Sequence, residues 1–172
     1  MVRNMLITIA MALCFFTNCE VIFAGELHGT ITWQYNNFVG TRGDTGAKIF
    51  LWPTNYDKST VTPLEEDTWI LGVSAPKNKN CFLTQADGYG NFDIYDIPAG
   101  EYIIFVLSRN TSHPPTQLQP YINYFSKYFQ DIDKFAKINL SMFKFTFATI
   151  KISNERINRF SYDFGYTYMQ MY

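Results

Sequence analysis

The strongest limit on the fold comes from residues 84–106, where strand-like stretches alternate with turn residues. An Asp-Gly pair at 87–88 and a Gly-Asn pair at 90–91 supply the positive φ angles that a tight hairpin needs. Pro98 and Gly100 mark a corner further on, because proline fixes φ and glycine relaxes it. The apolar residues after each turn recur with a period of two, which is typical of half-buried strands. The segment therefore predicts consecutive short β-strands joined by tight turns.

This segment resembles the carboxypeptidase regulatory-like domain, a transthyretin-like β-sandwich of seven strands with a carbohydrate-binding-like fold. That family has a Thr-Asp-x-x-Gly-x-Phe strand, an x-Pro-x-Gly-x-Tyr corner and then an apolar strand. The residues at matching positions are Thr84, Asp87, Gly90, Phe92, Ile97, Pro98, Gly100 and Tyr102. Residues 29–31 and 46–51 are similar to the first two strands of the family. The resemblance covers residues 25–108 and implies a non-catalytic module used for packing, adhesion or attachment.

The rest of the chain extends this pattern to an all-β sandwich of about seven strands. The expected strands are residues 27–35, 47–52, 81–85, 91–95, 101–108, 143–152 and 159–168. Residues 54–80 form an irregular insertion in which 64–71 could be a short helix. Residues 121–136 have apolar residues at helical spacing, so we expect one helix packed on the sandwich. Both segments depart from the minimal family fold.

Composition supports one aromatic-rich domain and excludes several classes of protein. The chain is 47% hydrophobic and 18% aromatic, which is not the composition of a disordered segment. Its 14 Lys and Arg are balanced by 15 Asp and Glu, so we expect no nucleic-acid partner. Many of the rings lie near the C-terminus, at alternate positions of 143–147 and 160–168. If those two strands are neighbours, their rings would form a cross-strand aromatic ladder.

The N-terminus predicts export. Residues 1–24 read as a signal peptide, with Arg3 before an apolar run at 6–16 and the small residue Ala24 at its end. This run is too short to span a membrane, and no later run is long enough, so we expect no membrane span after cleavage. An uncleaved anchor is the first alternative and a lipoprotein the second. Residues 25–172 would then be one secreted or cell-envelope domain.

The chain offers little material for catalysis. Once the leader is removed, Cys81 is the one remaining cysteine, so we expect a buried apolar residue and no internal disulfide. Only two histidines, His28 and His113, are present, and neither belongs to a metal-binding motif. We therefore expect no enzyme, no catalytic residue, no metal and no cofactor.

At the hairpin, Asp87, Asn91 and Asp93 offer oxygen ligands for a weak calcium site. The full calcium loop fails there, because its twelfth position is Pro98 instead of a glutamate. An ordinary hairpin turn explains the same residues.

Several functions remain open at this point. We expect a binding or interaction module whose partner is an unknown protein or glycan. A carbohydrate-binding module is one alternative, with Trp52, Tyr56, Trp69 and Tyr89 as candidate ligand-binding aromatics. A transthyretin-like homo-oligomer formed through an edge strand is another. A small hydrolase using His28 or His113 is the third.

Overall fold

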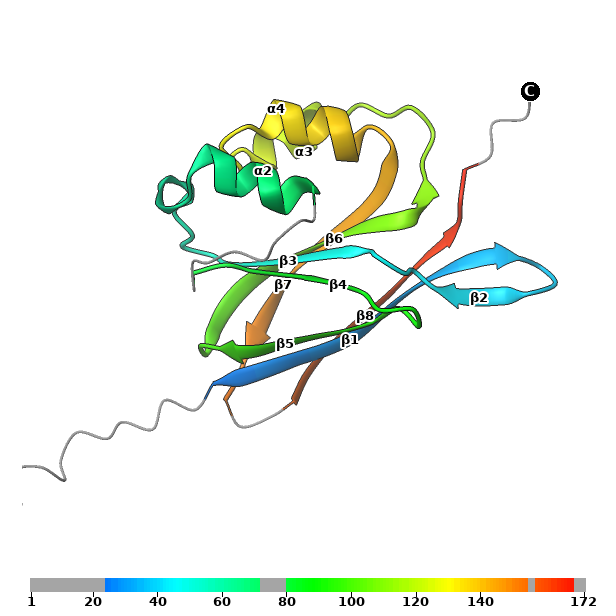
Figure 1. Cartoon of the computed structure of the whole chain (residues 1–172), viewed down its shortest axis with the longest axis horizontal. Helices are drawn as coiled ribbons and strands as arrows, with labels where there is room; N and C mark the ends of the chain where they lie inside the picture. Colours follow the sequence, from blue (N-terminus) through cyan, green and yellow to red (C-terminus); the bar gives the residue numbers. More distant parts are fainter. Residues whose placement is uncertain (1–23, 72–79, 155–156, 169–172) are drawn as a thin grey trace, which may run out of the picture.

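Two four-stranded sheets pack face to face, and helices cover the outer face of one of them (Figure 1). The computed structural model describes residues 24–71, 80–154 and 157–168. The predicted signal peptide, residues 1–24, lies outside the described residues except for Ala24. The predicted β-sandwich is confirmed, with eight strands in place of about seven.

The first sheet is built around the long strand β1 (Gly25–Asn36). Its partners are β2 (Gly40–Gly43), β5 (Asn91–Ile97) and β8 (Ile157–Tyr166). β2 and β5 are both antiparallel to β1 and share one of its edges, while β8 runs parallel to β1 along the other edge. This sheet thus joins the beginning of the domain to its last strand.

The second sheet is antiparallel throughout, in the order β4-β3-β6-β7. Its strands are β3 (Lys48–Pro53), β4 (Phe82–Gln85), β6 (Gly100–Ser112) and β7 (Phe143–Ile152). This sheet is the middle layer of the molecule, so both of its faces are covered. On β3, Ile49 and Leu51 face the first sheet, whereas Phe50 and Trp52 face the helices.

The helical layer is made of short pieces. They are η1 (Lys58–Thr60), α2 (Pro63–Leu71), α3 (Gln119–Phe125), α4 (Ile132–Phe135) and the π-helical segment η2 (Ala136–Leu140). The single helix expected at 121–136 is therefore interrupted. The interruption has a local cause: the Asp131 carboxylate accepts the Lys134 N–H at 3.0 Å, which caps a new helix at α4.

The aromatic ladder expected between 143–147 and 160–168 does not form. β7 and β8 are consecutive in the chain, but β7 pairs with β6 and β8 pairs with β1, so they belong to different sheets. Each is the outermost strand of its sheet. Rings of the two strands instead line one groove on the open side of the sandwich.

The turn residues of the family-like segment build the β4–β5 and β5–β6 connections. The Asp87 carboxylate accepts the backbone N–H groups of Tyr89 and Asn91, both at 2.8 Å. Gly90 follows with a φ of +85°, where a side chain would collide with the Ile31 carbonyl. At the next corner, the Tyr102 hydroxyl donates to the Pro98 carbonyl at 2.8 Å.

Candidate functional site

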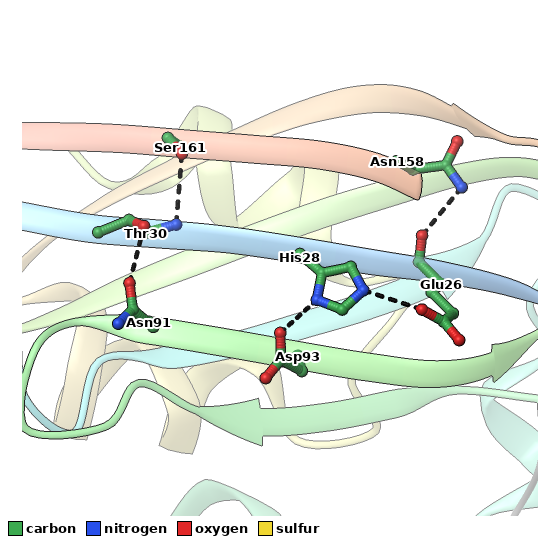
Figure 2. A network of polar contacts seen from close by, with 7 residues as sticks. All are labelled: Glu26, His28, Thr30, Asn91, Asp93, Asn158 and Ser161. Atoms are coloured by element: carbon green, nitrogen blue, oxygen red, sulfur yellow. Dashed lines mark hydrogen bonds and ion pairs between the residues drawn. The ribbon is translucent and has the colours of Figure 1, made fainter. Parts of the chain in front are cut away.

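A polar network covers the outer face of the first sheet, where His28 lies between two carboxylates (Figure 2). Its Nδ1 is 2.5 Å from Asp93 on β5, and its Nε2 is 3.0 Å from Glu26 on β1. Ionised carboxylates only accept hydrogen bonds, so both contacts are satisfied together when the imidazole is doubly protonated. Accordingly, the hydrogen bond to Glu26, followed by that to Asp93, raises the pKa of His28 above its usual 6.5.

The remaining members of this network also join strands. Thr30 donates its hydroxyl to Asn91 on β5 at 3.0 Å, and its backbone N–H donates to Ser161 on β8 at 3.3 Å. Asn158 of β8 donates to the Glu26 carbonyl at 3.0 Å. A hollow of about 210 Å³ lies among these side chains. Most polar groups of the network already bond to each other. The network therefore mainly stabilises the pairing of β5, β1 and β8 (Figure 2).

The network does not have the arrangement of a hydrolase. In a Ser-His-Asp triad, one ring nitrogen faces the carboxylate and the other faces the nucleophilic hydroxyl. Here the second nitrogen of His28 faces Glu26, and the Ser161 oxygen accepts a hydrogen bond from the backbone of Thr30. Among the described residues, both hydrogen-bond partners of the His28 ring are therefore carboxylates and neither is a hydroxyl or a thiol.

A larger groove of about 510 Å³ lies on the open side of the sandwich, between the edge strands β7 and β8. β7 contributes Phe145 and Phe147, and β8 contributes Tyr162 and Phe164. Tyr121, at the start of α3, closes one side and packs edge to face on Phe145, with the ring centres 4.9 Å apart. The groove thus collects rings from both sheets and from the helical layer.

Some polar groups of the groove already make hydrogen bonds within the protein, and others make none to the described residues. His113 has Nδ1 2.6 Å from the Pro114 carbonyl and Nε2 2.7 Å from the Leu140 carbonyl, so both nitrogens are occupied. The Lys144 ammonium donates to two carbonyls of β8. By contrast, the side chains of Thr116 and Gln117 make no hydrogen bond to any described residue. These uncommitted groups can bond to a ligand.

The four aromatics selected from the sequence do not form one surface. Trp52 and Trp69 are buried in the core under the helices, which replaces the expectation that they stack on a ligand. Trp52 instead stacks on Tyr128, with ring centres 5.0 Å apart. Tyr56 is half-buried beside it, and burial raises the pKa of the Tyr56 hydroxyl. Only Tyr89 is well exposed, at 82%, on the β4–β5 hairpin.

Cys81 and the proposed calcium ligands also have other roles. Cys81 is buried, and burial raises the pKa of its thiol to about 12, so it is an inert part of the core. Asp87 bonds to the backbone of its own turn, Asn91 to Thr30, and Asp93 to His28. Within the described residues, no three His, Cys, Asp or Glu side chains come together in a way that could hold a metal ion.

Two features of the structure could not be predicted from the sequence. The groove depends on β7 and β8 entering different sheets, which alternation within each strand does not reveal. Asp44, which lies between the predicted strands 27–35 and 47–52, is a fully buried carboxylate that bonds to the end of β6. A lone Asp between glycines, next to an apolar strand, was the available signal.

Comparison with known proteins gives few matches. No protein-family model matches the chain, and no curated protein does. Among solved structures, a candidate carbohydrate-binding protein from Pseudomonas aeruginosa is similar at 13% identity over 86% of this chain and 93% of its own, with a TM-score of 0.43. The minor pilin of Streptococcus agalactiae is similar at 11% identity over 89% of this chain, with a TM-score of 0.46. This chain spans about half of the pilin chain, 49%. Neither similarity assigns a ligand or a partner.

Proposed function

We propose that the protein is an exported, non-catalytic binding module, and that the groove between β7 and β8 holds its ligand. The groove itself carries the proposal. Its volume of about 510 Å³ is within the range of small-molecule sites, roughly 300–1,000 Å³. It joins partly exposed rings to hydrogen-bonding side chains that have no partner among the described residues. Export is inferred from the signal-like residues 1–24.

The ligand class that best fits this groove is a glycan. A sugar ring has an apolar C–H face, which packs on an aromatic ring, and hydroxyl groups around its edge. Tyr121, Phe147 and Tyr162 offer partly exposed rings, while Thr116 and Gln117 offer hydroxyl and amide groups. The lining includes one lysine and one histidine but no carboxylate, so a neutral or acidic glycan is favoured over a cationic ligand.

The groove is also organised before a ligand arrives. Tyr121 is fixed against Phe145, and Tyr162 lies edge to face with Phe164, also at 4.9 Å between ring centres. The Lys144 ammonium bonds to carbonyls near the end of β8 and fixes that strand against β7. Rigid rings lose little conformational entropy on binding, which favours affinity.

Binding without catalysis follows from the positions of the titratable groups. Both nitrogens of His113 contact backbone carbonyls, so neither nitrogen is directed at a ligand in the groove. The ammonium group of Lys144 is likewise held by carbonyl oxygens. The groups that remain available in the groove are suited to recognition.

A glycan-binding screen of the purified protein tests this proposal. We expect one or more neutral or acidic glycans to bind, with Tyr121→Ala reducing affinity at least tenfold, about 1.4 kcal/mol, through loss of a stacking face. Gln117→Ala should reduce affinity severalfold through loss of a hydrogen bond. Isothermal titration calorimetry measures both effects.

Tyr89→Ala is the matched control, because Tyr89 is an exposed tyrosine outside the groove. It should leave affinity unchanged. Absence of binding to every glycan would contradict the proposal, and so would a loss on Tyr89→Ala that the groove variants do not show.

A further inference from the structure

The tip of the β1–β2 hairpin presents an apolar side chain to solvent. Phe38 is fully exposed, at 102%, and its neighbour Val39 is 49% exposed. Among the described phenylalanines the next most exposed is Phe147, at 36%. A single exposed apolar residue is ordinary, but here two adjacent apolar side chains, Phe38 and Val39, are exposed together at the end of a hairpin, which points to a contact surface.

The hairpin holds this tip in a defined shape. The Asn36 side-chain oxygen accepts the N–H groups of Phe38 at 2.9 Å and Val39 at 2.7 Å. Gly40 completes the turn with a φ of +74°. From β8, the Tyr166 hydroxyl donates to the Asn37 side chain at 2.5 Å. Phe38 is thus held outward by structure on both sides of the turn.

Amphipathic side chains lie on the strands next to the tip. Tyr35 on β1 and Tyr166 on β8 are both exposed. The Arg42 guanidinium lies over the Tyr35 ring, 4.4 Å from its centre. Tyr35 lies on β1, which ends at Asn36, so Phe38 and Val39 lie beyond it at the turn. Arg42 is the only charged residue between Tyr35 and Gly43, so this end of the hairpin is weakly cationic.

We propose that the β1–β2 hairpin inserts Phe38 and Val39 into the surface of a lipid bilayer. Tyrosine rings prefer the headgroup level, and peripheral apolar groups enter a bilayer to a depth of about 5–10 Å. Both preferences fit an arrangement in which the apolar turn lies beyond the two tyrosines, which are on β1 and β8. Arg42 then lies at the depth of lipid phosphates, which favours anionic lipids.

The form of the hairpin favours a bilayer over a protein partner. Figure 1 shows β2 and the end of β1 reaching beyond the ends of the strands in the second sheet. A protein partner needs a broad contact area around a buried anchor to exclude water. A projecting two-stranded hairpin supplies little such area, whereas a bilayer can receive a narrow tip.

Co-sedimentation of the purified protein with vesicles tests the proposal. One set of vesicles is phosphatidylcholine alone, and the other contains phosphatidylglycerol as well. We expect the protein to bind both, and the anionic set more strongly. Phe38→Ser should weaken partitioning about tenfold or more, because the buried phenyl ring supplies most of the transfer free energy. Arg42→Gln should remove only the preference for the anionic vesicles.

Leu64→Ser is the matched control, since Leu64 is an exposed apolar residue, at 76%, on α2 in the helical layer. It should leave partitioning unchanged. Phe38→Trp gives a second readout: its emission should shift to the blue on vesicles and be quenched by brominated acyl chains, unlike that of Leu64→Trp.

Failure of the wild-type protein to bind either kind of vesicle overturns the proposal. The tip is then better explained as a contact for a pocket on a protein partner. Equal partitioning of the wild type and Phe38→Ser overturns it as well. Both results are independent of glycan binding, because Phe38 does not line the groove.

Discussion

At the level of single residues, Asp44 shows how one buried carboxylate stabilises an irregular strand end. The pairing of β6 with β7 loses its regular register between Leu107 and Ser112, so the backbone there lacks ladder partners. Asp44 accepts the Ser108 hydroxyl at 2.5 Å, two backbone N–H groups and the Asn110 amide at 2.7 Å. Charge-assisted hydrogen bonds of this kind are the stronger ones in proteins.

Replacing Asp44 should therefore destabilise the domain. We expect Asp44→Ala to lower the free energy of unfolding by about 3 kcal/mol, because the buried Ser108 hydroxyl and three part-buried donors lose their acceptor. Asp44→Asn keeps one acceptor oxygen and should cost less. Urea denaturation measures both, and a change below about 0.5 kcal/mol for the alanine variant would contradict this role for Asp44.

His28 predicts a dependence of stability on pH. Glu26 and Asp93 flank its ring, the Tyr95 ring lies edge-on at 5.7 Å, and Arg159 lines the same hollow from β8. Since the pKa of His28 is raised in the folded state, its stabilising contribution is complete below about pH 6.5 and is lost as pH rises through the folded value.

We expect the difference in unfolding free energy between the wild type and His28→Gln to shrink from about pH 6 to pH 9. The difference should also fall with added salt, because the cluster is partly exposed. Nuclear magnetic resonance titration of His28 provides the direct check. A midpoint at or below 6.5 would contradict the proposed pairing.

At the level of elements, the sequence predicts strands well because alternation is local. The predicted strand 143–152 coincides with β7, and 27–35 lies within β1. Within β1, Leu27 and Ile31 are buried and His28 lies on the outer surface, as a period of two requires (Figure 2). Each of these results requires only the pattern of neighbouring side chains.

For the same reason, the sequence does not predict which distant strands pair. β8 lies parallel to β1 although about 130 residues separate them, and neither alternating pattern specifies its neighbour. Because the sequence does not reveal that pairing, it predicts one aromatic ladder from the rings of β7 and β8. It does not predict the groove between these strands. The prediction that Trp52 contacts a ligand was wrong for a similar reason. Both faces of β3 are covered by other layers, and the sequence of β3 does not identify them.

At the level of the whole molecule, the second sheet separates two hydrophobic cores. One lies between the sheets and includes Ile49 and Ile104, and the other lies under the helices and includes Phe105 and Phe125. The second sheet forms one side of both cores. The other side is formed by the first sheet in one core and by the helices in the other. The sandwich layer is closed by strands, whereas the helical layer consists of short pieces that depend on tertiary contacts.

Glu66 joins those pieces. It is a buried residue of α2, and its carboxylate accepts the backbone N–H of Gln130 at 2.7 Å and of Asp131 at 3.0 Å, in the connection from α3 to α4. From the other side, Lys58 donates to the carbonyls of Ser126 and Phe129. The connection between the two helices is thus held by side chains from an earlier part of the chain.

Removing the Glu66 carboxylate should consequently loosen the helical layer before the sandwich. We expect Glu66→Ala to cost about 2 kcal/mol of stability and to lower amide hydrogen-exchange protection in α2, α3 and α4, with β1 and β5 nearly unchanged. Glu66→Gln, which retains one acceptor oxygen, should show a smaller loss at the same amides. Because the second sheet lies between the two cores, a uniform loss of protection across both layers would instead mean that the domain opens as one cooperative unit.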